Sequence, residues 1–323
     1  MATFKVTKGT PVAFRDSNYP TAYPSGHEGE LFYNSSSGAF QFLGLATGAW
    51  STGGNLNAGR SGLGGAGTQT AALAFAGIDG GANSAANELY NGSSWTEVGD
   101  LNTARYILGG TGTSTAALAC GGIGGLALTE KWDGSSWTES GDLNTSRSAL
   151  GSAGTTTAGI AFAGNAPGGN TVNAETFDGS SWTEVGNVNS ARDNVSDAGI
   201  QTAALLIGGT TPPGDSVKNL VEQWNGTAWT EIAEINTARR SLDAGGTTGS
   251  ALAFGGAANG ALTESWNGSA WTEVADLATA RGALGGGSQG SSNSLNIAFG
   301  GSPDVVSTEE WSFAHAIKTV TTS

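Results

Sequence analysis

Six arginines recur along the chain at nearly regular intervals, and their residue type and spacing suit the binding of an anion. They are Arg60, Arg105, Arg147, Arg192, Arg239 and Arg281. A guanidinium group binds a carboxylate or a phosphate through paired hydrogen bonds, so six of them gathered in one place would suit a carboxylated or phosphorylated glycan. The competing interpretation is structural, because Arg–carboxylate pairs that tie repeated units together would explain the same spacing without a ligand.

Acidic side chains recur near the same arginines, and they favour the structural interpretation. A tryptophan stands ten residues before each arginine, and a glutamate follows five of the six tryptophans by two residues. These glutamates are Glu97, Glu139, Glu184, Glu231 and Glu273. Four units add an acid five residues after the tryptophan, at Asp100, Asp142, Glu234 and Asp276. In the first unit Thr52 and Asn55 take these positions, so Arg60 has no predicted acidic partner.

The tryptophans are a second repeated set, and aromatic rings of this kind either stack on sugars or fill a core. They are Trp50, Trp95, Trp137, Trp182, Trp229 and Trp271. Because they recur in every unit beside a tight turn, we predict that they are structural and pack between neighbouring units.

The side chains that most enzymes need are scarce in this sequence. Its only histidines are His27 and His315, both outside the repeats, and its one cysteine, Cys120, stands where other units place a core phenylalanine. We therefore predict no catalytic residues, no metal site, no cofactor and no enzymatic activity.

Composition and charge argue against further classes of function. Among 323 residues there are 54 glycines, and 27 acidic against 13 basic residues give a net charge of −14. An acidic chain without a basic cluster is not expected to bind nucleic acid, because phosphates must be neutralised by cations. No run of 18 apolar residues predicts membrane insertion, and the first residues do not have the pattern of a secretory signal.

The repeat predicts four short β-strands in each unit. Successive tryptophans are 42 to 47 residues apart. The first strand begins at the arginine, the second is a small apolar run that ends in glycine, the third ends on an aromatic residue and the fourth begins at the tryptophan. Between the third and fourth strands stands Asn-Gly or Asp-Gly, a strong signal for a β-hairpin. Helices are not expected, because glycine and β-branched residues are frequent and no 3.6-residue period is present.

Arginine, Gly-Gly, an aromatic residue and tryptophan at this spacing resemble the kelch repeat, in which each unit is one blade of a β-propeller. The resemblance implies an all-β, six-bladed kelch-like β-propeller with four-stranded blades over residues 48–312. The last unit lacks a fourth strand, so we expect the strand in 48–56 to close the ring by completing it. A seventh blade made from 30–50 and 312–323 is the alternative.

Loop lengths predict which face of the propeller carries function. The connection between the second and third strands varies most in length, and its longest copy lies near 209–216. Following the strands up and down one blade places these loops on the same face as the six arginines. Variable loops on a rigid scaffold commonly carry binding sites. The arginine face, with the arginines at the mouth of a central channel, is therefore the predicted recognition surface.

The segment 1–47 differs from the repeats. Residues 29–43, which begin Gly-Glu-Leu-Phe-Tyr-Asn, predict a hairpin and resemble hairpins of phage tail fibres and related virion proteins. Together with the propeller, this hairpin resembles virion proteins of marine tailed bacteriophages. The resemblance implies a non-enzymatic structural protein in the virion, located at the particle surface or in the tail.

Three parts with separate roles follow from this interpretation. The segment 1–47 would dock to other virion proteins, the propeller 48–312 would serve for display or for recognition of a host-surface glycan or receptor, and 313–323 would be a C-terminal tail. We expect the protein to be oligomeric in the particle. The alternatives are an intracellular kelch-type interaction scaffold and a glycan-processing propeller enzyme.

Overall fold

The computed structural model describes residues 13–15, 31–34, 39–45, 48–123, 127–257, 260–287, 293–313 and 315–319. The chain divides into two compact units. One is Ala49–Ser312, and the other combines Met1–Gly48 with Phe313–Ser323. The regular elements of the described residues are all β-strands, and the larger unit is a six-bladed β-propeller. The predicted fold class and blade number are therefore confirmed.

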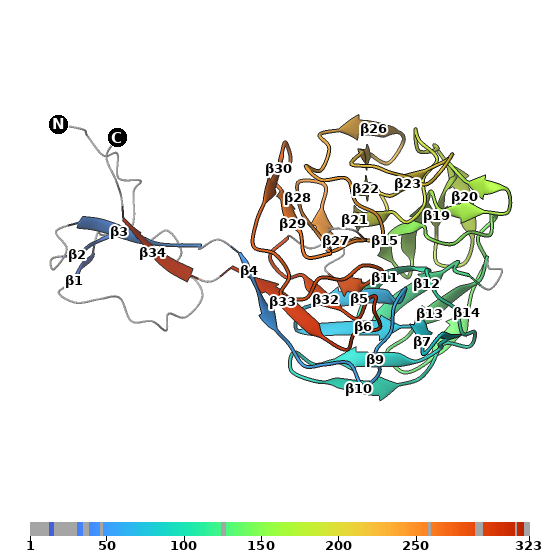
Figure 1. Cartoon of the computed structure of the whole chain (residues 1–323), viewed down its shortest axis with the longest axis horizontal. Coiled ribbons are helices and arrows are strands. Elements are labelled where there is room, and N and C mark those ends of the chain that lie inside the picture. The colour runs from blue at the N-terminus through green and yellow to red at the C-terminus, as the bar shows by residue number, and fades with distance from the viewer. Residues whose placement is uncertain are drawn as a thin grey trace. The chain divides into compact units, whose positions relative to one another are not determined.

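Each blade is a four-stranded antiparallel sheet, and the innermost strands of neighbouring blades contact one another around the ring (Figure 1). The innermost strands are β5 (Gly64–Thr68), β11 (Gly109–Thr113), β15 (Gly151–Thr155), β21 (Ser196–Ile200), β27 (Asp243–Thr247) and β31 (Gly285–Gly287). The second strands are β6 (Ala71–Phe75), β12 (Ala116–Cys120), β16 (Ala158–Phe162), β22 (Ala203–Ile207), β28 (Ser250–Phe254) and β32 (Ile297–Phe299). We number the blades 1 to 6 in this order.

The two outer strands of each blade flank the Asn/Asp-Gly turn. The third strands are β9 (Asn87–Tyr90), β13 (Thr129–Trp132), β19 (Ala174–Phe177), β25 (Val221–Trp224), β29 (Thr263–Trp266) and β33 (Thr308–Ser312). The outermost strands are β10 (Trp95–Val98), β14 (Trp137–Glu139), β20 (Trp182–Val185), β26 (Trp229–Ile232), β30 (Trp271–Glu273) and β4 (Ala49–Thr52). In β10, Trp95 is buried while Thr96 and Glu97 are exposed, which is typical of an edge strand.

Small residues on the innermost strands let the blades approach closely. A Cβ atom on Gly65 of β5 would lie 2.0 Å from the backbone oxygen of Gly286 in β31. The second strands are buried along nearly their whole length, as in β6 and β22, which explains their continuous apolar sequence. The core therefore lies between blades, where small inner strands face large side chains from the strands behind them.

The N-terminal strand closes the ring, as the sequence predicted. In blade 6, β4 pairs with β33 in antiparallel register, and Trp50 stands opposite Trp311 (Figure 1). We call the junction of blades 6 and 1 the seam. Tyr90 of blade 1 adds a polar contact there, because its hydroxyl donates to Oε1 of Glu310 at 2.5 Å. Burial and this hydrogen bond raise the pKa of Tyr90 to about 12.

The segments considered for a seventh blade form a sheet of their own in the smaller unit. This sheet has the order β1 (Ala13–Arg15), β2 (Leu31–Asn34), β3 (Ala39–Leu45) and β34 (His315–Thr319). The predicted hairpin is present, since β2 pairs antiparallel with β3. The C-terminal strand β34 pairs antiparallel with β3. Residues 315–319 of the predicted C-terminal tail therefore belong to the same sheet as the N-terminal strands.

The loops between second and third strands lie beside the arginines, as expected. In every blade, the residue after the arginine forms a backbone bridge with the third residue after the second strand, for example Ser61 with Ile78. The three longest loops carry small hairpins of their own. These are β7 (Ile78–Asp79) with β8 (Ala82–Asn83), β17 (Asn165–Ala166) with β18 (Gly169–Asn170), and β23 (Thr210–Thr211) with β24 (Ser216–Val217). Blades 1, 3 and 4 therefore extend further on this face than the other three blades.

Candidate functional site

Each of the six repeated arginines forms a buried ion pair with a glutamate on the third strand of its own blade. The glutamates are Glu88, Glu130, Glu175, Glu222, Glu264 and Glu309. In five of the pairs the nitrogen–oxygen distance is 2.5 to 3.0 Å. The arginines are at most 2% exposed. A buried charge of this kind is tolerated only when it is paired and hydrogen-bonded.

Further hydrogen bonds complete each pair. In blade 1, Arg60 Nη1 donates to the backbone oxygens of Ala76 and Ala86 at 2.8 and 2.7 Å. The second carboxylate oxygen of Glu88 accepts from the backbone and side-chain nitrogens of Asn57 at 2.7 and 2.8 Å. Asn57 follows β4 of blade 6, whereas Glu88 belongs to blade 1. The hydrogen bonds to Glu88 therefore anchor the linker that leads from blade 6 into blade 1.

The same asparagine occurs three residues before the arginine in five units. These are Asn57, Asn102, Asn144, Asn189 and Asn236, and each donates to the glutamate of the pair. In the sixth unit Ala278 stands there, and only its backbone nitrogen donates to Glu309. The recurring constellation is therefore Asn, Arg and Glu.

These contacts correct two sequence-based predictions. The partner of each arginine is the glutamate two residues before the third-strand aromatic, not the acid that follows the tryptophan. Glu97 lies on an outermost strand and is exposed, so it cannot satisfy a buried guanidinium. Arg60 does have a partner, Glu88. The six guanidinium groups therefore do not form a ring of free cations at the channel mouth.

The repeated tryptophans pack between blades. Five of them, Trp95, Trp137, Trp182, Trp229 and Trp271, are 5 or 6% exposed, whereas Trp50 at the seam is half-buried. Trp137 lies 5.0 Å from Phe75 of the preceding blade, ring centre to ring centre. Trp182 donates from Nε1 to Thr129 of the preceding blade at 2.9 Å. These rings occupy the core and are not presented as a sugar-stacking platform.

Cys120 is likewise buried in the core, and burial raises the pKa of its thiol to about 12.

Backbone hydrogen bonds form a belt around the channel two residues after each arginine, and they join every neighbouring pair of blades except blades 3 and 4. The belt residues have φ between 49° and 61°, and they are Gly62, Ile107, Ala149, Asn194, Ser241 and Ala283. For example, Ile107 donates to the oxygen of Gly62 at 2.7 Å and accepts from the nitrogen of Ala149. A left-handed conformation at a β-branched residue such as Ile107 is rare, so the ring must hold it in place.

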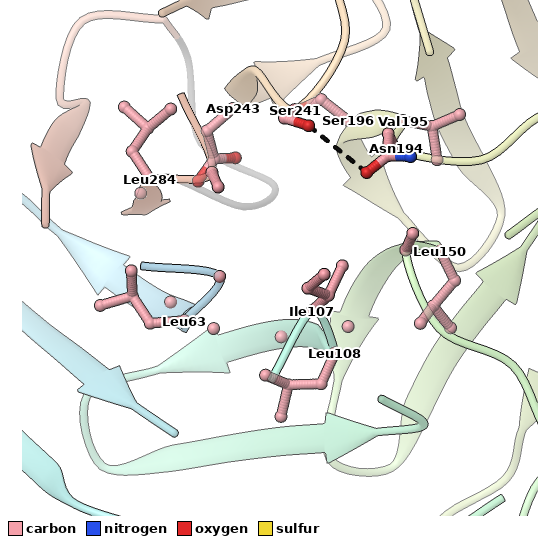
Figure 2. A pocket seen from close by; sticks show the side chains of 18 of the residues that line it. Leu63, Ile107, Leu108, Leu150, Asn194, Val195, Ser196, Ser241, Asp243 and Leu284 are labelled. Atoms are coloured by element: carbon pink, nitrogen blue, oxygen red, sulfur yellow. Dashed lines mark hydrogen bonds between the residues drawn. The ribbon is translucent and has the colours of Figure 1, made fainter. Parts of the chain in front are cut away.

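Inside the belt lies a central cavity of about 130 Å³, to which all six blades contribute (Figure 2). Ligand pockets for drug-sized molecules are larger, roughly 300–1,000 Å³. Asp243 is the ionisable side chain among those labelled around the cavity in Figure 2. Burial raises the pKa of its carboxyl to about 7, against a hydrogen bond from the Ala244 nitrogen that lowers it. The cavity is thus suited to water or a small solute.

The residue directly after each arginine lies on the face of the propeller, outside the belt. We call these six positions the rim, and they are Ser61, Tyr106, Ser148, Asp193, Arg240 and Gly282. No two neighbouring blades carry the same rim residue, in contrast to the invariant arginine beside it. Tyr106 is half-buried, unlike the tryptophans that fill the core. The sequence pattern did not single out the rim, because unlike residues produce no repeat.

A second hollow lies on the same face, between blades 5 and 6. It is an open groove of about 340 Å³ lined mainly by glycine, alanine and serine. Its lining residues include Ser241, Ala257, Gly260, Gly282 and Ser302. Blade 5 has no small hairpin among its described loop residues.

Comparison with protein-family models and with curated proteins finds no match for this chain. The six-bladed propeller is consistent with the kelch-like architecture. Among the described residues there is no group of three or more His, Cys, Asp and Glu side chains placed to hold a metal ion. No helix long and apolar enough to cross a membrane occurs in that part of the chain.

Proposed function

We propose that this protein is a non-enzymatic structural protein of a tailed-phage particle. The propeller serves for display or for recognition of the host surface, and the N-terminal segment attaches it to other virion proteins. Support comes from the sequence resemblance of residues 29–43 to tail-fibre hairpins and from the hairpin of β2 and β3 at that place.

The observation that carries the recognition role is the contrast between the framework and one face. Six equivalent Arg–Glu pairs, five of them joined by an asparagine, hold the blades together, whereas the rim and the adjoining loops differ from blade to blade. A rigid scaffold that presents unlike groups on one face is the usual design of a binding protein. The arginine face is accordingly the surface that we assign to the host.

The location is tested on particles of the phage that encodes this chain. Gradient-purified, salt-washed particles are analysed by mass spectrometry, and a labelled antibody against the propeller is located by electron microscopy. We expect the protein in the particles, with label at the surface or tail. Its recovery in the host-cell fraction alone would contradict the proposal and favour an intracellular scaffold.

The recognition role needs a separate assay. Purified full-length protein is added to host cells before the phage, and adsorption is measured. A host-recognition module should compete with the phage and lower adsorption in proportion to its concentration. Unchanged adsorption with saturating protein, together with confirmed presence in the particle, would leave display as the function.

A further inference from the structure

Arg240 differs from every other cation among the described residues of the propeller. The six repeated arginines are in buried ion pairs. Lys131 donates to the backbone oxygen of Gly179, and Lys218 donates to Ser216. Arg240 has neither an ion pair nor a side-chain hydrogen bond among the described residues, and it is half-buried. A guanidinium with five donors that the fold leaves unused is available to a ligand.

The position of Arg240 connects it with the groove between blades 5 and 6. Its backbone oxygen accepts from the nitrogen of Ala257 at 2.8 Å, and the two residues form an antiparallel bridge. Residues opposed in this way present their side chains on the same face. Ala257 lines the groove, and so does Ser241, the next residue in the chain. Arg240 is not itself a lining residue, but it adjoins two residues that are, so we infer that its side chain reaches the groove from beside it.

The groove offers polar groups without bulk. Ser302 contributes an exposed hydroxyl, and Gly256, Gly260 and Gly282 have no side chain to fill the space. The Ser241 hydroxyl donates to Oδ1 of Asn194 at 3.3 Å. Hydroxyls and accessible backbone can match the many hydroxyls of a sugar, while a guanidinium matches a carboxylate in a two-pronged geometry. The volume of about 340 Å³ is in the range of pockets that hold small ligands.

Charge limits the number of anionic groups that the ligand can carry. The chain has a net charge of −14, so a polyanion would be repelled by the protein as a whole. A single carboxylate responds mainly to the nearest cation, because salt screens charges beyond about 8 Å at physiological ionic strength. The surroundings of Arg240 thus favour one negative charge on an otherwise neutral ligand.

We propose that this groove binds a sugar bearing one carboxylate, and that Arg240 is the residue that pairs with the carboxylate. The proposal rests on the proposed role in host recognition and names the class of its ligand. It moves the anion site from the six buried arginines to Arg240, which has no side-chain partner among the described residues of the propeller.

The test uses the purified full-length protein and calorimetric titration with methyl glucuronide and with the methyl glycoside of N-acetylneuraminic acid. Each sugar is paired with its neutral methyl ester. At least one acid should bind, and its ester should bind at least about tenfold more weakly, as expected for one charge-assisted contact. Arg240→Ala should weaken binding of the acid by a similar factor, and Arg240→Lys by less.

Lys218→Ala is the matched control, because it removes one positive charge from the same face at another blade. It should change binding less than twofold. The proposal is overturned if neither acid binds at millimolar concentration, if acid and ester bind equally, or if Arg240→Ala binds like the parent. Equal binding of N-acetylglycine, a carboxylate without a sugar, would overturn the sugar class. The particle-association assay does not involve Arg240, so it distinguishes failure of this inference from failure of the virion role.

Discussion

Arg239 and Arg240 are consecutive residues of the same type with opposite surroundings. Arg239 is buried, pairs with Glu264 at 2.9 Å and has an equivalent in all six blades. Burial lowers its pKa, although the charge of Glu264 acts in the opposite direction. Arg240 lies on the rim with no side-chain partner in the described part of the propeller, and other blades place serine, tyrosine, aspartate or glycine there. Positions that are identical around the ring hold the propeller together, whereas positions that differ are available for recognition.

The largest effect is expected from breaking the ring itself. Deleting residues 1–56 removes β4 and leaves β33 as an unpaired edge, which invites aggregation. We expect loss of cooperative unfolding in urea and aggregation in size-exclusion chromatography. The control deletes 1–47 together with 313–323, which keeps the closing strand. A soluble 1–56 deletion as stable as this control would contradict closure by β4.

Removing a core residue that recurs in every blade should lower the free energy of unfolding more than removing an aromatic residue on the rim of the same blade. Trp137→Ala should lower the free energy of unfolding by about 3–5 kcal/mol, because it empties a packed space between blades 1 and 2. Tyr106→Ala should cost about 1 kcal/mol or less, since that ring is half-buried. Urea unfolding of both variants measures the difference. Similar losses for the two would remove the distinction between core and rim.

Asp243 differs from its equivalents inside the ring, because four other blades begin the innermost strand with glycine, at Gly64, Gly109, Gly151 and Gly285. Its folded-state pKa of about 7 exceeds the unfolded value of about 3.9, so the folded state binds the proton more tightly. Its contribution to stability is therefore full below pH 4 and is lost as pH rises through 7, at up to about 1.4 kcal/mol per pH unit.

Asp243→Asn tests this pH dependence, since the amide does not titrate. Relative to the parent, the variant should gain stability between pH 4 and pH 8, as measured by thermal unfolding across that range. Parallel curves for parent and variant would show that the carboxyl ionises freely in the folded protein.

The smallest effect is expected where variation in sequence leaves the geometry unchanged. Asn91 and Asp133 occupy equivalent turns, and each side chain accepts from the backbone nitrogens two and three residues ahead. The hydrogen bonds from Ser135 and Ser136 lower the pKa of Asp133 to about 2. Asn91→Asp should therefore raise the melting temperature slightly at pH 7, and the gain should disappear as pH falls from 4 to 2. A lower melting temperature at pH 7 would show that the turns are not equivalent.

Much of this fold could be predicted from repeat spacing alone, because four strands, a tight turn and a closing strand follow from local residue patterns. The partner of the arginine could not be deduced as easily, since two glutamates recur in five of the six units. Glu88 lies on the third strand and is buried, whereas Glu97 lies on the outermost strand and faces solvent. The constant two-residue spacing from Glu88 to Tyr90, repeated in six units, was the available signal.

Other features had no sequence signal. Pairing of β34 with β3 joins the two ends of the chain, and no repeat marks either strand. The rim is defined by backbone bridges, and apart from the two serines Ser61 and Ser148 its residues differ in chemistry. Arg240 became recognisable only when every other described cation of the propeller had been assigned a partner.

The measurement that tests the central claim most directly is the free energy of unfolding of Arg239→Ala beside that of Arg240→Ala. The first leaves Glu264 buried without its partner and should cost about 3–5 kcal/mol. The second removes an unpaired side chain from the surface and should change stability by no more than about 0.5 kcal/mol. Equal losses, or a tolerated Arg239→Ala, would contradict the assignment of uniform positions to structure and varied positions to recognition.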